Sequence, residues 1–215
     1  MIILGLTGSV GMGKSTAAAM LRQLGLPLHD SDAAVHRLLA PRGAAVAAVA
    51  AAFPGVRNAA AGIDRPLLGR RVFGDPPALR RLERILFPLV RQSQDRFLRQ
   101  ARARRAPLVV LDIPLLFETD GDSRCDKVVV VSAPAALQRA RVMARPGMTE
   151  ARFRAVLAQQ MPDAEKRRRA DYVVPTGLGR AATFRRLRRI VAALLESGAE
   201  GGAGPRCHAD SDARP

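Results

Sequence analysis

Residues 2–16 read Ile-Ile-Leu-Gly-Leu-Thr-Gly-Ser-Val-Gly-Met-Gly-Lys-Ser-Thr, and this stretch decides the fold. The apolar run at residues 2–7 predicts a buried strand, and residues 16–24 carry apolar side chains at helical spacing. Between them, residues 8–15 fit the pattern G-x-x-x-x-G-K-[ST], which forms a phosphate-binding loop when it joins a strand to a helix. The chain is therefore predicted to bind a nucleoside triphosphate.

The loop's residue types explain how it would hold phosphate. Glycines let the chain curl with its N–H groups inward, where they and the following helix N-terminus attract phosphate oxygens. Lys14 is expected to reach the β- and γ-phosphates, and the Ser15 hydroxyl to ligate Mg²⁺. The expected ATP-binding residues here are Gly8, Gly11, Met12, Gly13, Lys14, Ser15 and Thr16.

Further apolar runs extend the strand pattern along the chain. They predict strands at residues 26–29, 108–112, 127–132 and 172–175. Helical patterns separate most of these runs. The predicted fold class is therefore α/β, a P-loop NTPase-type five-stranded parallel sheet with helices on both faces.

One stretch breaks this alternation, because three helical patterns follow one another without a strand. They span residues 66–72, 78–85 and 88–104. We interpret the stretch as a helical insertion into the α/β core.

The chain of 215 residues has room for one sizeable core, and we expect a single domain at residues 1–196. Residues 181–195 predict a closing helix. Residues 197–215 lack apolar periodicity and predict a disordered tail. No apolar run reaches the length of a membrane span, and the first residues lack the basic start of a signal peptide. We therefore expect a cytoplasmic protein with no membrane partner.

The formal net charge of +16 would suit a nucleic-acid partner. Aromatic residues make up only 4% of the chain, however, so few side chains are available for stacking on bases. Almost all the basic residues are arginine, as is common in proteins from GC-rich genomes, and most of the excess charge fits solvated surface. A nucleic-acid-binding P-loop protein is the less favoured alternative.

If the chain transfers phosphate from the nucleotide to a hydroxyl, it needs a group that positions that acceptor hydroxyl, besides the phosphate-binding loop. Asp30 and Asp32 follow the second predicted strand, at the sheet edge that faces the ligand crevice in α/β folds. We favour Asp32 as the general base, while Asp30 or Ser31 caps the next helix. Asp112 ends the third predicted strand and is either a Mg²⁺ ligand or a solvated strand-end residue.

Arginines follow the fourth predicted strand, where nucleotide kinases carry a helical lid. Arg141 and Arg145 are spaced i, i+4 and could share one helix face. Arginine in a lid stabilises the charge on the transferring phosphoryl group. We expect a catalytic role for Arg141 and an ATP contact for Arg145.

Two other classes of P-loop protein fit the sequence poorly. A switch GTPase would carry a guanine-reading N-K-x-D motif, which the sequence lacks, and an ATPase motor would usually be larger. These exclusions favour an ATP-dependent phosphotransferase that acts on an alcohol group of a small acceptor.

Taken together, the motifs resemble those of the dephospho-coenzyme A kinase family over roughly residues 1–195. The resemblance is carried by residues 6–16, Asp30-Ser31-Asp32 with Arg37, Ile63-Asp64-Arg65, residues 112–118 (Asp-Ile-Pro-Leu-Leu-Phe-Glu), Gln138 with Arg141 and Arg145, Gln160-Met161, and residues 170–173. The D-x-D, P-L-L-x-E and Q-x-x-R combination is far more specific than the phosphate-binding loop alone.

The resemblance implies transfer of the ATP γ-phosphate to the ribose 3′-hydroxyl of dephospho-CoA, the last step of coenzyme A biosynthesis. It implies Asp32 as the base, a helical acceptor-binding insertion near residues 55–105 and a lid near residues 138–165. The substrate-binding residues that it implies are Asp30, Arg65, Leu115 and Glu118. The expected partners are ATP and dephospho-CoA with Mg²⁺ as cofactor, and the expected state is a monomer or weak homo-oligomer.

The chain departs from the family's pattern at three positions. Phe87 stands where the family commonly has His before the proline, and Thr176 lies in the run that replaces the family's usual Asn. Asp112 is often apolar in the family. Another P-loop nucleoside or small-molecule kinase is the alternative on the same scaffold.

Overall fold

The computed structural model describes residues 1–200, with the side chains of residues 1–197. It divides the chain into two units. One contains residues 1–28 and the chain from residue 105 onward, and the other contains residues 29–104. Residues 201–215 of the predicted tail lie outside the described residues.

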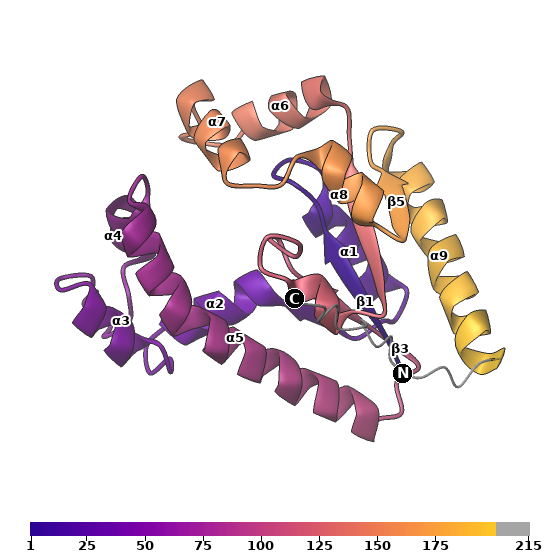
Figure 1. The fold of residues 1–215 in the computed structure, drawn as a ribbon, viewed down its shortest axis with the longest axis horizontal. Coiled ribbons are helices and arrows are strands. Elements are labelled where there is room, and N and C mark those ends of the chain that lie inside the picture. The colour runs from indigo at the N-terminus through magenta and orange to yellow at the C-terminus, as the bar shows by residue number, and fades with distance from the viewer. Residues whose placement is uncertain (201–215) are drawn as a thin grey trace, which may run out of the picture. The chain divides into compact units, whose positions relative to one another are not determined.

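Five strands form one sheet in the order β2-β3-β1-β4-β5 (Figure 1). They are β1 (Ile2–Thr7), β2 (Leu28–Asp30), β3 (Leu108–Asp112), β4 (Lys127–Ser132) and β5 (Tyr172–Pro175). β1 pairs in parallel with β3 and β4, and β4 pairs in parallel with β5. Every residue of β3 is buried, as expected for a strand covered on both faces. The predicted five-stranded parallel sheet is confirmed.

Helices α1 (Lys14–Gln23) and α9 (Arg180–Glu200) cover one face of the sheet, with α9 beside β5 (Figure 1). Alternate strand residues such as Leu4 and Leu6 point to this face, because side chains alternate along a strand. They pack against Leu21 of α1 and Leu187 of α9, all fully buried. This core supports the loop between β1 and α1.

The opposite face is covered by the β3–β4 connection, with its short helix η1 (Gly121–Arg124), and by α8 (Asp163–Arg169). Here a Cβ on Gly5 would lie 2.8 Å from Cys125 Sγ, so only glycine leaves room for the thiol. Burial, reinforced by the nearby Asp122, raises the pKa of the Cys125 thiol to about 12. The thiol therefore stays protonated at neutral pH and serves as packing.

Two further helices, α6 (Ala135–Met143) and α7 (Glu150–Ala158), lie in the region predicted to be a lid. Glu150 at the start of α7 accepts hydrogen bonds from Arg139 Nε of α6 at 3.0 Å and from Arg154 Nε at 3.3 Å. The hydrogen bond from Arg139 is the main reason that the pKa of Glu150 is lowered from its ordinary value. Of these two exposed pairs, the one with Arg139 joins α6 to α7, and it connects the helices only weakly.

The second unit is helical. Its helices are α2 (Ser31–Leu39), α3 (Val46–Ala52), α4 (Arg65–Val72) and α5 (Pro76–Ala103). Asp30, Asp64 and Asp75 each precede a helix and accept a hydrogen bond from the N–H three residues later. These N-caps satisfy donors that a helix start leaves free. A separate apolar core that includes Val49 and Leu82 joins the helices.

One helix boundary predicted in this unit is wrong. The helices expected at residues 78–85 and 88–104 are the single helix α5, which continues through Pro88. Pro88 removes one hydrogen bond to the carbonyl of Arg84, but both residues are exposed, so water can satisfy that carbonyl. Buried residues before and after Pro88, such as Leu86 and Leu98, keep the helix packed.

The predicted start of the tail is also corrected. Helix α9 continues to Glu200, whereas the sequence predicted a helix end at residue 195 and disorder from residue 197. Ser197 Oγ donates to the Leu194 carbonyl at 3.1 Å, a bond compatible with helix. Within residues 1–200, no helix is both long and apolar enough to cross a membrane.

Candidate nucleotide site at the phosphate-binding loop

The loop between β1 and α1 has the backbone that its glycines predict. Gly11 and Gly13 have φ angles of 77° and 90°, in the left-handed region that favours glycine. A Cβ on Gly8 would lie 2.7 Å from the carbonyl oxygen of Val131. Helix α1 begins at Lys14, so its free N–H groups face the loop and form an anion-binding end.

Lys14 and Asp112 form an ion pair at the base of this loop. Lys14 Nζ lies 2.8 Å from Asp112 Oδ1, and the two side chains are 16% and 4% exposed. The register of β1 against β3 places Asp112 beside Leu6, near the end of β1. The structure thus brings together two predicted site residues that are 98 positions apart. Ser15, the other predicted metal ligand, is exposed in the first turn of α1.

Two glutamines hold the loop at Val10. Gln138 of α6 donates from Nε2 to the Val10 carbonyl at 2.8 Å. Gln160, just after α7, accepts from the Val10 N–H at 3.0 Å through Oε1. The exposed side of the loop is therefore fixed by residues from the predicted lid region.

Arg141 and Thr176 hold the loop at its other end. Arg141 donates to Thr176 Oγ1 at 3.0 Å and to the Thr176 carbonyl at 2.8 Å, and it reaches the Gly11 carbonyl at 3.4 Å. Thr176 Oγ1 donates to the Met12 carbonyl at 2.8 Å. The predicted catalytic arginine thus lies at the loop, held by protein groups. Arg145, one turn further, is exposed.

Sequence reasoning missed the part that Thr176 plays. Thr176 is buried directly after β5, and its side chain would lie 3.2–3.3 Å from a Cβ on Gly13. Its hydroxyl therefore connects Arg141, the loop and the end of the sheet. The available signal was its position, since a polar residue just beyond a parallel strand faces the ligand edge.

We predict that Thr176→Val lowers kcat/KM for ATP by about tenfold. Valine keeps the shape but leaves the Met12 carbonyl and an Arg141 N–H without their partner, a loss of about 1–3 kcal/mol when such groups are buried. Thr176→Ser, which keeps the hydroxyl, is the matched control and should stay close to the parent enzyme. Equal steady-state constants for the two variants would contradict this role.

Glu118 and Lys166 form a second ion pair that is largely withdrawn from solvent. Lys166 Nζ lies 2.8 Å from Glu118 Oε1, and the Lys166 side chain is fully buried. The same carboxylate oxygen accepts from the Met161 N–H at 2.8 Å. Glu118, expected at the substrate, thus fixes α8 and the segment before it in this structure. Leu115, another expected substrate residue, is half-buried in the turn after β3.

We predict that Glu118→Gln destabilises the fold by about 3 kcal/mol, because it leaves the buried Lys166 ammonium without its countercharge. Urea unfolding measures this loss. The double variant Glu118→Gln/Lys166→Met should recover most of it, since an apolar side chain needs no countercharge. A KM for the phosphate acceptor that stays raised in the double variant would place Glu118 at the substrate as well.

Three of the predicted acceptor-side residues, Asp30, Asp32 and Arg65, lie in the second unit. Asp30 Oδ1 accepts from the Ala33 N–H at 2.9 Å, so the expectation that Asp30 or Ser31 caps α2 is confirmed for Asp30. Asp32 is exposed in the first turn of α2, and within residues 1–197 its carboxylate makes no hydrogen bond or ion pair. Arg65 is exposed at the start of α4.

The described side chains contain no cluster of three or more His, Cys, Asp or Glu that could hold a metal ion by itself. Mg²⁺ that binds with a nucleotide takes one or two protein oxygens and completes its shell with phosphate and water. The Ser15 hydroxyl beside the loop and the Asp112 carboxylate at its base are oxygen donors of that kind.

Comparisons with known proteins agree with this geometry. The profile of one protein family, described as dephospho-CoA kinase, matches residues 2–178. A dephospho-CoA kinase of Rhodospirillum rubrum is 60% identical over 187 residues, 87% of this chain and 89% of the relative.

Solved structures show the same fold. The structure of TT1252 from Thermus thermophilus is 39% identical with a TM-score of 0.76, and the match covers 89% of this chain and 96% of that one. A dephospho-CoA kinase from Campylobacter jejuni has a TM-score of 0.68 at 22% identity, covering 91% of this chain and 98% of the other. The second likeness supports the fold alone.

Proposed function

The chain belongs to the dephospho-CoA kinase family, and on this premise we propose how its residues transfer the γ-phosphate of ATP to the ribose 3′-hydroxyl of dephospho-CoA. The observation that carries the proposal is the ion pair of Lys14 with Asp112 at the base of a phosphate-binding loop. A flexible ammonium beside a helix N-terminus is placed to meet phosphate when nucleotide binds.

The loop would bind the ATP phosphates through its N–H groups, and Lys14 would turn from Asp112 toward the β- and γ-phosphates. Ser15 and Asp112 would hold Mg²⁺, which neutralises charge on the phosphates when bound. Arg141 would keep the loop in shape and add positive potential at Gly11. Arg145, exposed beyond the end of α6, would contact the phosphates from the lid.

On the acceptor side, Asp32 would accept the proton of the 3′-hydroxyl. The oxygen would then attack the γ-phosphorus, the bond from that phosphorus to the bridging β–γ oxygen would break, and ADP would leave. An exposed carboxylate with no partner among the described side chains suits this task, because nothing in the protein competes for it. Asp30 and Arg65 would help to bind the acceptor.

A coupled ADP-release assay with Mg-ATP tests the proposal against a panel of acceptors: dephospho-CoA, adenosine, AMP, CMP and shikimate. We expect ADP release that depends on dephospho-CoA, with CoA identified by mass. ADP release with another acceptor alone would support the nucleotide site but show that dephospho-CoA is not the acceptor. No release with any acceptor would overturn the proposed reaction.

A further inference from the structure

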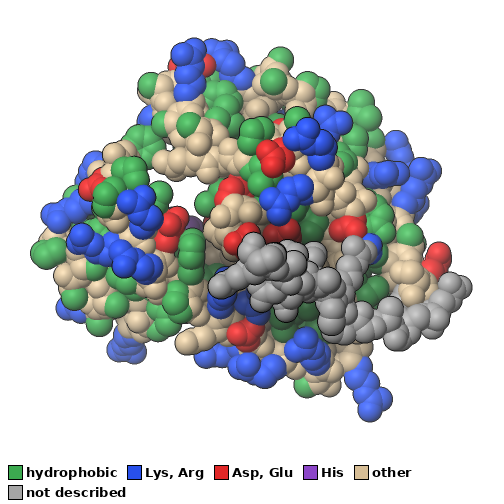
Figure 2. Space-filling view, viewed as in Figure 1, with side chains coloured by type: hydrophobic (Ala, Val, Ile, Leu, Met, Phe, Trp, Pro, Cys, Tyr) green, Lys and Arg blue, Asp and Glu red, His purple; other side chains and the backbone are tan. Residues whose placement is uncertain are grey.

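The chain carries a formal net charge of +16. Figure 2 shows Lys and Arg side chains scattered over one face of the molecule, with apolar and acidic side chains between them. A more organised group lies on α9, where residues 180–195 contain five arginines and no acidic residue. Equal charges this close repel one another, so an anionic ligand there would relieve their repulsion.

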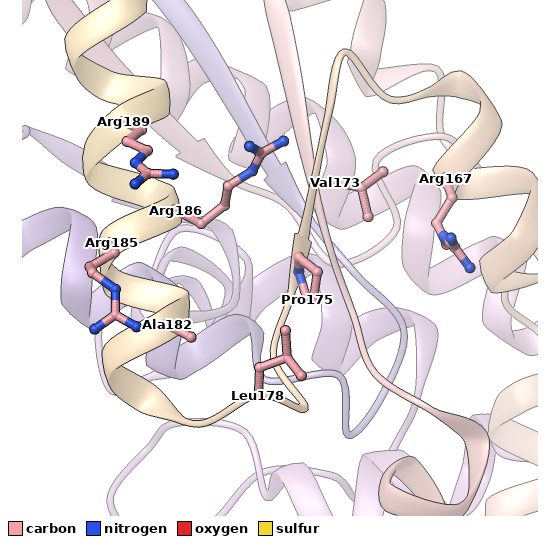
Figure 3. Close-up of a pocket in the computed structure, with 8 residues that line it drawn as sticks. All are labelled: Arg167, Val173, Pro175, Leu178, Ala182, Arg185, Arg186 and Arg189. Carbon is pink, nitrogen blue, oxygen red and sulfur yellow. The ribbon is translucent and has the colours of Figure 1, made fainter.

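Three of these arginines border a hollow of about 450 Å³ at the edge strand β5. Figure 3 shows Arg185, Arg186 and Arg189 on α9 on one side of β5 and Arg167 on α8 on the other. The rest of the lining is apolar: Val173, Pro175, Leu178 and Ala182. None of these residues belongs to the phosphate-binding loop, although Arg167, Val173 and Pro175 also border a neighbouring hollow that includes Met12 of that loop.

The four guanidinium groups have no partner among the described side chains. Within residues 1–197, none of them forms a hydrogen bond or an ion pair, although the chain places carboxylates beside other arginines, such as Glu150 beside Arg139. Guanidinium binds phosphate with two parallel hydrogen bonds, which makes arginine well suited to phosphorylated ligands. Arginines from two helices border the same hollow, so a ligand there could meet more than one guanidinium group.

We propose that this hollow binds a phosphorylated small molecule with an apolar or aromatic part, the class to which nucleotides belong. Its volume lies in the range of about 300–1,000 Å³ that small ligands occupy. The arginines would hold the phosphates, and Val173, Pro175 and Leu178 would cover the apolar part. Leu178 is 75% exposed, an unusual position for leucine that such a ligand would cover.

Equilibrium dialysis of the full chain with ADP, without Mg²⁺ and at about 0.1 M ionic strength, tests the proposal through four variants. Lys14→Ala should lose the equivalent bound at the phosphate-binding loop. Arg186→Ala on α9 and Arg167→Ala on α8 should each leave that equivalent in place. Each should weaken binding of the second ADP, the one in the hollow, by about tenfold or more, as expected for a charged hydrogen bond. Arg188→Ala is the matched control, because Arg188 is an exposed arginine of α9 that does not line the hollow.

Inorganic tripolyphosphate should displace the ADP that depends on Arg186, which would show that phosphate carries the binding. If Arg188→Ala weakens binding as much as Arg186→Ala, the attraction is diffuse and the site is overturned. If neither Arg167→Ala nor Arg186→Ala changes ADP binding, the site is likewise overturned. The arginines would then protect the edge strand from pairing with other chains. The acceptor assay above is independent of all these outcomes.

Discussion

Asp32→Asn should lower kcat for transfer to dephospho-CoA by about 10²- to 10⁴-fold, the contribution of a positioned general base. Asparagine has nearly the same size but cannot take the proton of the 3′-hydroxyl. Because Asp32 is exposed and makes no hydrogen bond or ion pair within residues 1–197, the fold should persist. Single-turnover measurement of CoA formation with saturating Mg-ATP gives the rate of the chemical step.

Asp75→Asn is the matched control for this change. Asp75 caps α5 in the same unit, and asparagine caps a helix as well as aspartate does, so this variant should retain full activity. Thermal melting should show that both variants unfold close to the parent temperature. Turnover of Asp32→Asn at the parent rate would remove Asp32 as the base.

The sheet could be predicted from the sequence because its signals are local. β4 and β5 have the boundaries predicted from their β-branched runs, 127–132 and 172–175. The phosphate-binding loop could be predicted equally well, since eight consecutive residues determine its shape. The N-cap at Asp30 follows from its position just before a helical pattern.

Helix α8 shows what local signals do not reveal. Its residues, Asp-Ala-Glu-Lys-Arg-Arg-Arg, have no apolar periodicity, and no helix was predicted there. Its packing depends on Lys166, which is buried against Glu118 from a segment 48 positions earlier. In the sequence, a charged residue that forms an ion pair in the interior cannot be distinguished from a charged residue on the surface.

The same reason explains what was missed around the loop. The loop is held by three residues that lie more than 120 positions from their loop partners in the sequence: Gln138, Gln160 and Thr176. The two glutamines indicated a family resemblance and Thr176 a departure from it, but none of the three indicated a contact. Which backbone group each one holds depends on where the fold places α6, α7 and the end of β5 around the loop, and only the structure gives that arrangement.

Lys14→Ala should also stop phosphoryl transfer, with kcat reduced by at least about 10²- to 10³-fold, because it removes a positive charge that meets the transferring phosphate. The structure adds a second expectation. Asp112 is only 4% exposed, so loss of its 2.8 Å partner leaves a buried carboxylate without that countercharge. The fold should lose about 3 kcal/mol of stability.

The double variant Lys14→Ala/Asp112→Asn separates these two effects. Removing the buried charge should restore most of the stability measured by urea unfolding, while phosphoryl transfer stays lost. Recovery of both would mean that Lys14→Ala acts only by disturbing the fold, and recovery of neither would mean that the Lys14–Asp112 pair does not account for the lost stability. Recovered stability without activity would show that phosphoryl transfer is not lost through the fold, as expected if Lys14 meets the phosphates and Asp112 helps to hold Mg²⁺.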